Sequence, residues 1–205
     1  MATAKKPAAK TKKPQKQTPE PQELLLTELR EIYSAENQLA RALPRFTKAV
    51  ETEALRTQFE RRLEEDQRLI EALDRAFENM DATPGRKKNV AAEGLIADAQ
   101  EHVQEIERGP ALDAVLIGAV QKTEHYCIAA WGTTRSFAQL MGETEVVKAM
   151  ERALEEGKRY DEELTRLAEE EVNPAMLATG EDESEEEERE TRSSRGKSDG
   201  GEARA

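Results

Sequence analysis

The chain has 205 residues, of which 37% are hydrophobic and 36% charged, with a formal net charge of −12 at pH 7. This composition fits one folded domain with polar tails, and the lack of an apolar run of about 18 residues argues against a transmembrane helix. The N-terminal lysines are not followed by the apolar stretch of a secretory signal. A single cysteine excludes an intramolecular disulfide and fits a reducing compartment, so we expect a cytoplasmic protein that does not engage membranes.

The two ends of the chain are predicted to be disordered. Residues 1–22 form a Lys/Pro/Ala segment with six lysines and one glutamate, and residues 173–205 include the acidic run EDESEEEERE. The basic tail is interpreted either as an arm that makes weak contact with nucleic acid or an acidic partner, or as a solubilising tail. The acidic body between the tails argues against nucleic-acid binding by the folded domain itself.

Apolar residues at helical spacing predict four long helices and one short helix. The first two long helices are expected over residues 23–50 and 52–80, with Pro44 kinking the first or ending its regular part. A loop rich in helix breakers and a short crossover helix over residues 89–108 follow. The other long helices span residues 110–141, where Gly142 is a suitable C-terminal cap, and 143–171, where Asn173-Pro174 ends the helix. No segment shows the alternation of a strand, so the predicted fold class is all-α.

The helix after Pro110 contains an acid in an apolar setting. Residues 114–142 include a single carboxylate, Glu124, which shares a helix face with Val120, Cys127 and Trp131. Burying an ionised carboxylate costs several kcal/mol unless a counter-charge or a metal compensates for it. Glu124 therefore requires a partner.

An internal repeat suggests three further acids. Residues 63–73 and 154–164 are identical at six of eleven positions, and a central acid lies on the helix before each copy. The acid on the first helix, Glu36, lies in the middle of the apolar stripe of residues 23–50, as Glu124 does in its own helix. The repeat predicts that four carboxylates converge between the helices, where two divalent cations would balance their charge: Glu36, Glu65, Glu124 and Glu156. Glu65 and Glu156 lie toward the flanks of their apolar stripes, whereas Asp66 and Gly157 lie near the centres. Asp161 also faces inward on its helix.

Several strings resemble the YciE/YciF family of bacterial ferritin-like proteins: YSAENQ at residues 33–38, ALP at 42–44, LEE at 63–65 and EHYCIAAWGT at 124–133. The similarity spans residues 23–170. It implies a ferritin-like four-helix bundle over residues 23–172, with the short extra helix in the crossover between the second and third long helices. It also implies homodimeric association and a stress-response role. A centre with two iron or manganese ions and weak oxidase or peroxide-consuming activity would follow from the four glutamates.

The chain departs from the ferritin pattern at the positions that matter for metal binding. Arg68 and Arg159 occupy the places of the usual histidines three residues after a ligating glutamate, and a guanidinium has no lone pair for a metal. Three further positions differ from the residues common in similar chains: Arg62 for histidine, and Cys127 and Gly157 for glutamate.

These departures support an alternative hypothesis, in which Arg68, Arg159 and Arg62 form a buried ion-pair network with Glu65, Glu156 and Glu36. The chain would then be a non-enzymatic stress or interaction protein with a decayed metal site. His125 is interpreted as a contact between helices and Cys127 as core packing. The sequence leaves open whether Asp66, Asp161, His125 or Cys127 contributes to the site, and whether the protein is an enzyme.

Overall fold

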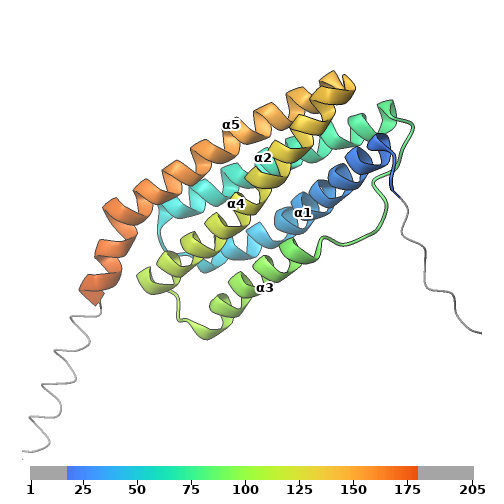
Figure 1. Ribbon diagram of the computed structural model, residues 1–205. Coiled ribbons are helices and arrows are strands. Elements are labelled where there is room, and N and C mark those ends of the chain that lie inside the picture. The colour runs from blue at the N-terminus through green and yellow to red at the C-terminus, as the bar shows by residue number, and fades with distance from the viewer. Residues whose placement is uncertain (1–17, 180–205) are drawn as a thin grey trace, which may run out of the picture.

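The computed structural model describes residues 18–179, and within that range every regular element is a helix. Four long helices lie side by side as a bundle, and a short helix flanks α1 and α4 (Figure 1). The elements are α1 (Pro21–Ala49), α2 (Glu53–Asn79), α3 (Val90–Glu105), α4 (Pro110–Met141), α5 (Thr144–Leu167) and the π-helical segment η1 (Ala168–Val172). The predicted all-α bundle, with its extra helix between the second and third long helices, is confirmed.

Local sequence explains where the helices begin and end. Pro21 and Pro110 occupy first-turn positions, where a missing N–H costs nothing. The Asn89 side chain accepts a hydrogen bond of 3.0 Å from the Ala92 N–H and caps α3. Gly142 adopts the left-handed conformation, with φ of 76°, that ends α4 as predicted.

The prediction that Asn173-Pro174 ends the last helix is wrong, because residues 173–179 continue as helix beyond η1. The Asn173 N–H bonds to the Ala168 carbonyl, five residues back, which marks a widened turn directly before Pro174. Such a turn accommodates the missing N–H and the ring of a proline. Pro44 likewise lies inside α1, which continues to Ala49. Disorder is predicted for residues 1–22 and 173–205, but residues 21–22 and 173–179 are helical, and residues 1–17 and 180–205 lie outside the described residues.

A polar layer divides the apolar core halfway along the bundle. One cluster packs around Phe46, Phe59 and Leu116, and the other around Leu29, Leu73 and Met150. Among residues 18–179, five of the six buried charged residues lie at the positions between the two clusters on α1, α2 and α4: Glu36, Arg62, Glu65, Asp66 and Glu124. The sixth is Asp113, near the start of α4, so the fold concentrates most of its buried charge in this layer.

The N-terminus of α2 is held by a side chain from α4. The buried Asp113 carboxylate accepts hydrogen bonds from the backbone N–H groups of Glu51, at 3.0 Å, and Thr52, at 2.7 Å. Because helix starts carry unsatisfied N–H groups, this contact fixes the connection between α1 and α2 against α4. Among residues 18–179, no helix is long and apolar enough to cross a membrane.

Candidate functional site

The centre of the polar layer is a cation, the guanidinium of Arg62. Its Nε lies 2.9 Å from Glu124 Oε2, its Nη1 bonds to Asp66 Oδ1, and its Nη2 lies 3.6 Å from Glu36 Oε2. All four side chains are at most 3% exposed. We call these four residues the Arg62 cluster. The partner that Glu124 requires is therefore an arginine in this structure.

Aromatic rings enclose the Arg62 cluster. The Arg62 Cζ lies 5.4 Å from the ring centroid of Trp131 and 5.9 Å from that of Tyr160, within the range of cation–π attraction. The Trp131 indole Nε1 donates a hydrogen bond of 3.0 Å to Glu36 Oε1. All four long helices thus contribute a side chain to the cluster or to its walls.

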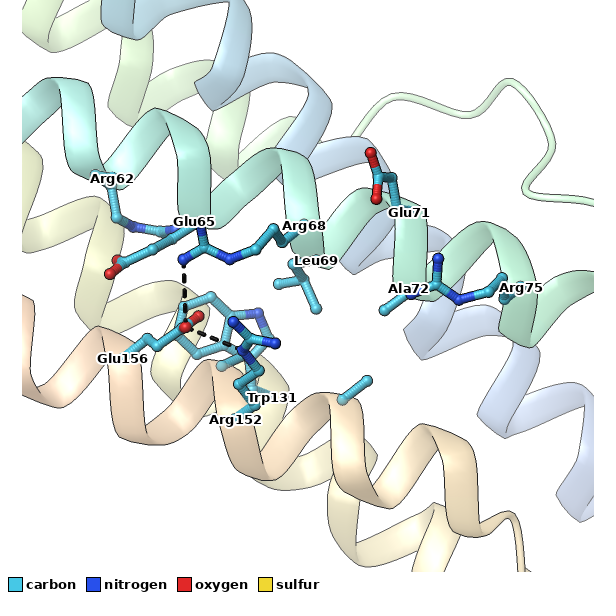
Figure 2. A pocket seen from close by; sticks show the side chains of 12 residues that line it. Arg62, Glu65, Arg68, Leu69, Glu71, Ala72, Arg75, Trp131, Arg152 and Glu156 are labelled. Carbon is cyan, nitrogen blue, oxygen red and sulfur yellow. Dashed lines mark hydrogen bonds and ion pairs between the residues drawn. The ribbon is translucent and has the colours of Figure 1, made fainter.

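The other two predicted ligands lie outside this cluster and contact other arginines. Glu65 is buried, and its Oε1 accepts a hydrogen bond of 3.0 Å from Arg159. Glu156 Oε1 lies 3.0 Å from Arg152 Nε and 3.4 Å from Arg68 Nη2 (Figure 2), and its side chain is 17% exposed. The structure therefore brings Glu36 and Glu124 to one guanidinium, places Glu65 near them, and leaves Glu156 partly buried beside Arg68 and Arg152.

The arginines form ion pairs with the glutamates that the ion-pair hypothesis named, but Arg68 and Arg159 do not pair with the glutamate on their own helix. That hypothesis coupled Arg68, Arg159 and Arg62 with Glu65, Glu156 and Glu36, and each of these arginines does contact one of these glutamates. The two flanking pairs cross between helices, because Arg68 on α2 contacts Glu156 on α5 and Arg159 on α5 contacts Glu65 on α2. Sequence neighbours at i and i+3 are not the partners here.

The cluster's donor set does not fit a di-metal centre. The space between Glu36, Asp66 and Glu124 holds a guanidinium, which offers a metal no lone pair and repels a second cation at short range. Among residues 18–179, no group of three or more His, Cys, Asp or Glu side chains is arranged to hold a metal ion. Two divalent ions could enter only if Arg62 left its place.

Burial perturbs the titration of the cluster. Desolvation raises the pKa of Glu124 to about 7, although the adjacent Arg62 lowers it. Desolvation also raises the pKa of Asp66 well above its usual range, against the opposing effect of Arg62. Burial alone would lower the pKa of Arg62, but Asp66, Glu124 and Glu36 hold it well above its usual value. One guanidinium faces three carboxyl groups, which would give the cluster a net negative charge if all three were ionised. Protonation of Glu124 and Asp66, whose pKa values are raised, reduces this charge.

The sequence left four further residues open, and the structure separates them. Asp66 is a full member of the cluster, whereas Asp161 lies outside it, with Oδ1 3.3 Å from Nε2 of His125. His125 is 67% exposed and makes the predicted contact between helices α4 and α5. Cys127 is buried in the apolar core, as its pattern predicted, and desolvation raises the pKa of its thiol.

Two features of the site were missed in the sequence. Arg62 and Asp66 are spaced i, i+4 on one helix face, a signal that could have identified Asp66 as its partner. The Trp131 N–H bond to Glu36 links residues 95 positions apart, and no local pattern predicts it.

Comparison with known proteins places the chain in a family. The model of the domain of unknown function DUF892 matches residues 20–177. Protein YciF of Escherichia coli (strain K12) is 39% identical over 153 residues, which are 74% of this chain and 92% of that protein. The crystal structure of this E. coli stress protein superposes with a TM-score of 0.72 and 38% identity, over 76% of this chain and 99% of that one.

More distant structures share the same architecture. YcfI of Rhodopseudomonas palustris has a TM-score of 0.68 and 34% identity, and covers 72% of this chain and 94% of its own. A ferritin-like, diiron-carboxylate protein of Bacillus anthracis has a TM-score of 0.58, over 74% of this chain and 99% of its own. At 17% identity it shows likeness of fold alone. The chain therefore has a ferritin-like fold, is a homologue of YciF and belongs to the DUF892 family.

Proposed function

We propose that this protein is a non-enzymatic stress protein in which Arg62 replaces the metal ions of a ferritin-like centre. The observation that carries the proposal is the position of the Arg62 guanidinium, in contact with Glu36, Asp66 and Glu124. An arginine with three carboxyl partners and two aromatic walls rigidifies the centre of the bundle, but it provides no open coordination position for oxygen or peroxide. The stress role is taken from the description of E. coli YciF.

Metal analysis tests the proposal directly. Protein purified with added iron or manganese, and freed of loosely bound ions, is expected to contain much less than one ion per chain, and Glu124→Gln should not change that amount. Arg62→His removes the guanidinium and offers an imidazole ligand, so this variant is expected to retain more metal than the wild type. Two ions per wild-type chain that are lost in Glu124→Gln would contradict the proposal.

A metal-dependent function is the second candidate. Within residues 18–179, one carboxylate oxygen each of Glu36, Asp66 and Glu124 has no hydrogen-bond partner, and hard cations bind such oxygens. In this case iron or manganese would displace Arg62, and a weak oxidase or peroxide-consuming activity would accompany the metal. The same metal analysis, with peroxide consumption measured on the loaded protein, separates the two candidates.

We also propose two partners for the chain, a second copy of itself and an acidic surface such as nucleic acid. The basic segment of residues 1–22 would make the second contact, and residues 1–17 of it lie outside the described residues. Retention on DNA should fall with salt and disappear when residues 1–17 are deleted, a change that leaves α1 intact. Equal retention of the truncated protein would contradict this contact. Light scattering of the full chain measures the oligomeric state.

A further inference from the structure

A pocket of about 200 Å³ opens between α2 and α5, beside the Arg62 cluster but on the solvent side of it (Figure 2). Its inner wall is apolar and consists of Trp131, Leu69 and the small side chains of Ala72, Ala149 and Ala153. Its rim carries three arginines, Arg68, Arg75 and Arg152. The pocket therefore combines an apolar floor with a basic edge.

The rim of the pocket carries more positive than negative charge. Arg68 and Arg152 both contact the same carboxylate oxygen, Glu156 Oε1, and Arg75 makes no ion pair within residues 18–179. The Glu71 carboxylate points away from Trp131 and Arg152 (Figure 2). Two of the three guanidiniums thus share one carboxylate and the third has no ion pair in this range, although each has five N–H donors.

The remaining lining carboxylate is already engaged. Glu65 is buried against Arg159, at 3.0 Å, and Arg61 lies 3.7 Å from the same oxygen. It therefore cannot also neutralise the rim. The side chains of Arg68 and Arg152 are 42% and 61% exposed, so both can turn toward a ligand at small desolvation cost.

We propose that this pocket binds a small organic anion, with one carboxylate or phosphate group held by Arg68, Arg75 and Arg152 and an apolar part seated on Leu69 and the alanines. Guanidinium groups bind both acid groups through paired charge-assisted hydrogen bonds. The cavity volume limits the apolar part to about the size of one ring or a short alkyl chain. The proposal does not depend on whether the Arg62 cluster ever holds a metal.

The chain provides its own reporter, because Trp131 is its single tryptophan and lines the pocket. Phenyl phosphate and benzoate are titrated into the full-length protein at low ionic strength, with tryptophan fluorescence and calorimetry as readouts. At least one of them is expected to bind saturably, and the one that binds more tightly identifies the acid group. Benzyl alcohol, which keeps the ring but lacks the charge, is expected to bind at least about tenfold more weakly.

Variants locate the site. Arg75→Gln/Arg152→Gln removes two rim charges and leaves Glu156 its contact with Arg68, and binding of the aromatic anion should weaken at least about tenfold. Arg45→Gln, which changes an exposed arginine on α1, is the matched control and should bind like the wild type. Circular dichroism checks that each variant is folded. The proposal is overturned if neither anion binds saturably, if benzyl alcohol binds as tightly as the anions, or if the double variant binds like the wild type.

Discussion

Gly157 on α5 lies directly against Glu124 on α4, so closely that a Cβ at position 157 would overlap the Glu124 carboxylate. The same Cβ would lie 2.5 Å from Trp131 Cζ3. Both neighbours belong to the packed centre of the bundle, where neither side chain is more than 2% exposed. A glycine is required here by close approach between helices and not by backbone conformation.

Gly157→Ala is therefore expected to destabilise the protein. Alanine gains about 1 kcal/mol over glycine in helix propensity, but overpacking of a buried site costs about 1–3 kcal/mol and here also displaces Glu124 from Arg62. Urea denaturation measures the difference. Gly132→Ala on α4 is the matched control: its Cβ would meet nothing within 4 Å, so the variant should be as stable as the wild type or more stable. Equal stability of both variants would contradict the packing argument.

Removing the guanidinium should be more damaging than any change on the rim. Arg62→Met keeps much of the side-chain volume but leaves Glu36, Asp66 and Glu124 without their cation, at a cost of about 3–5 kcal/mol near neutral pH. The cost should be smaller near about pH 5, where the carboxyls can take up protons. Thermal melts at both pH values, compared with the exposed variant Arg45→Gln, provide the measurement. A loss of stability that does not depend on pH would show that packing, and not charge, is the main effect.

Glu124 gives the protein a pH-dependent stability of defined sign. Its pKa is about 7 in the folded protein and 4.5 in the ordinary reference state, so the native protein binds this proton more tightly than the unfolded chain. Its contribution to stability is present below pH 4.5 and is lost as the pH rises to about 7. This shift corresponds to at most about 3 kcal/mol.

Glu124→Gln should flatten this dependence, because an amide cannot ionise and can still accept a hydrogen bond from Arg62. The variant is expected to be more stable than the wild type above neutral pH and similar to it near about pH 5. Urea denaturation over a pH series checks the prediction, with the exposed Glu155→Gln as a control that should keep the wild-type profile. A wild-type profile in Glu124→Gln would assign the titration to another group.

Asp113 is expected to stabilise the fold through the start of α2. Asp113→Ala removes the acceptor of the Glu51 and Thr52 N–H groups and leaves these part-buried donors without it, at a cost of about 2–3 kcal/mol. Hydrogen exchange at these two amides should accelerate together with the loss of stability. Unchanged exchange in the variant would mean that other acceptors or water replace Asp113.

The sequence alone determined the helices and the direction in which their key residues face. The spacing of apolar residues located the helices that became α1 to α5, and the same spacing correctly predicted buried positions for Glu36 and Glu124. The resemblance to ferritin-like chains also drew attention to Arg62, Arg68 and Arg159 as departures from that pattern. These properties are local, because a helical residue's direction depends on its own neighbours along the chain.

Only the tertiary structure decided which cation meets which acid. Arg62 and Arg68 both lie on α2, yet one reaches the buried centre and the other the surface, where it contacts Glu156. Helical periodicity fixes each residue's angle around its own axis, but it leaves the rotation and axial offset between helices undetermined. A shift of one turn, about 5.4 Å along the axis, would bring each arginine to different partners. The close approach of Gly157 to Glu124 and Trp131 is one contact that belongs to this particular packing of α5 against α4.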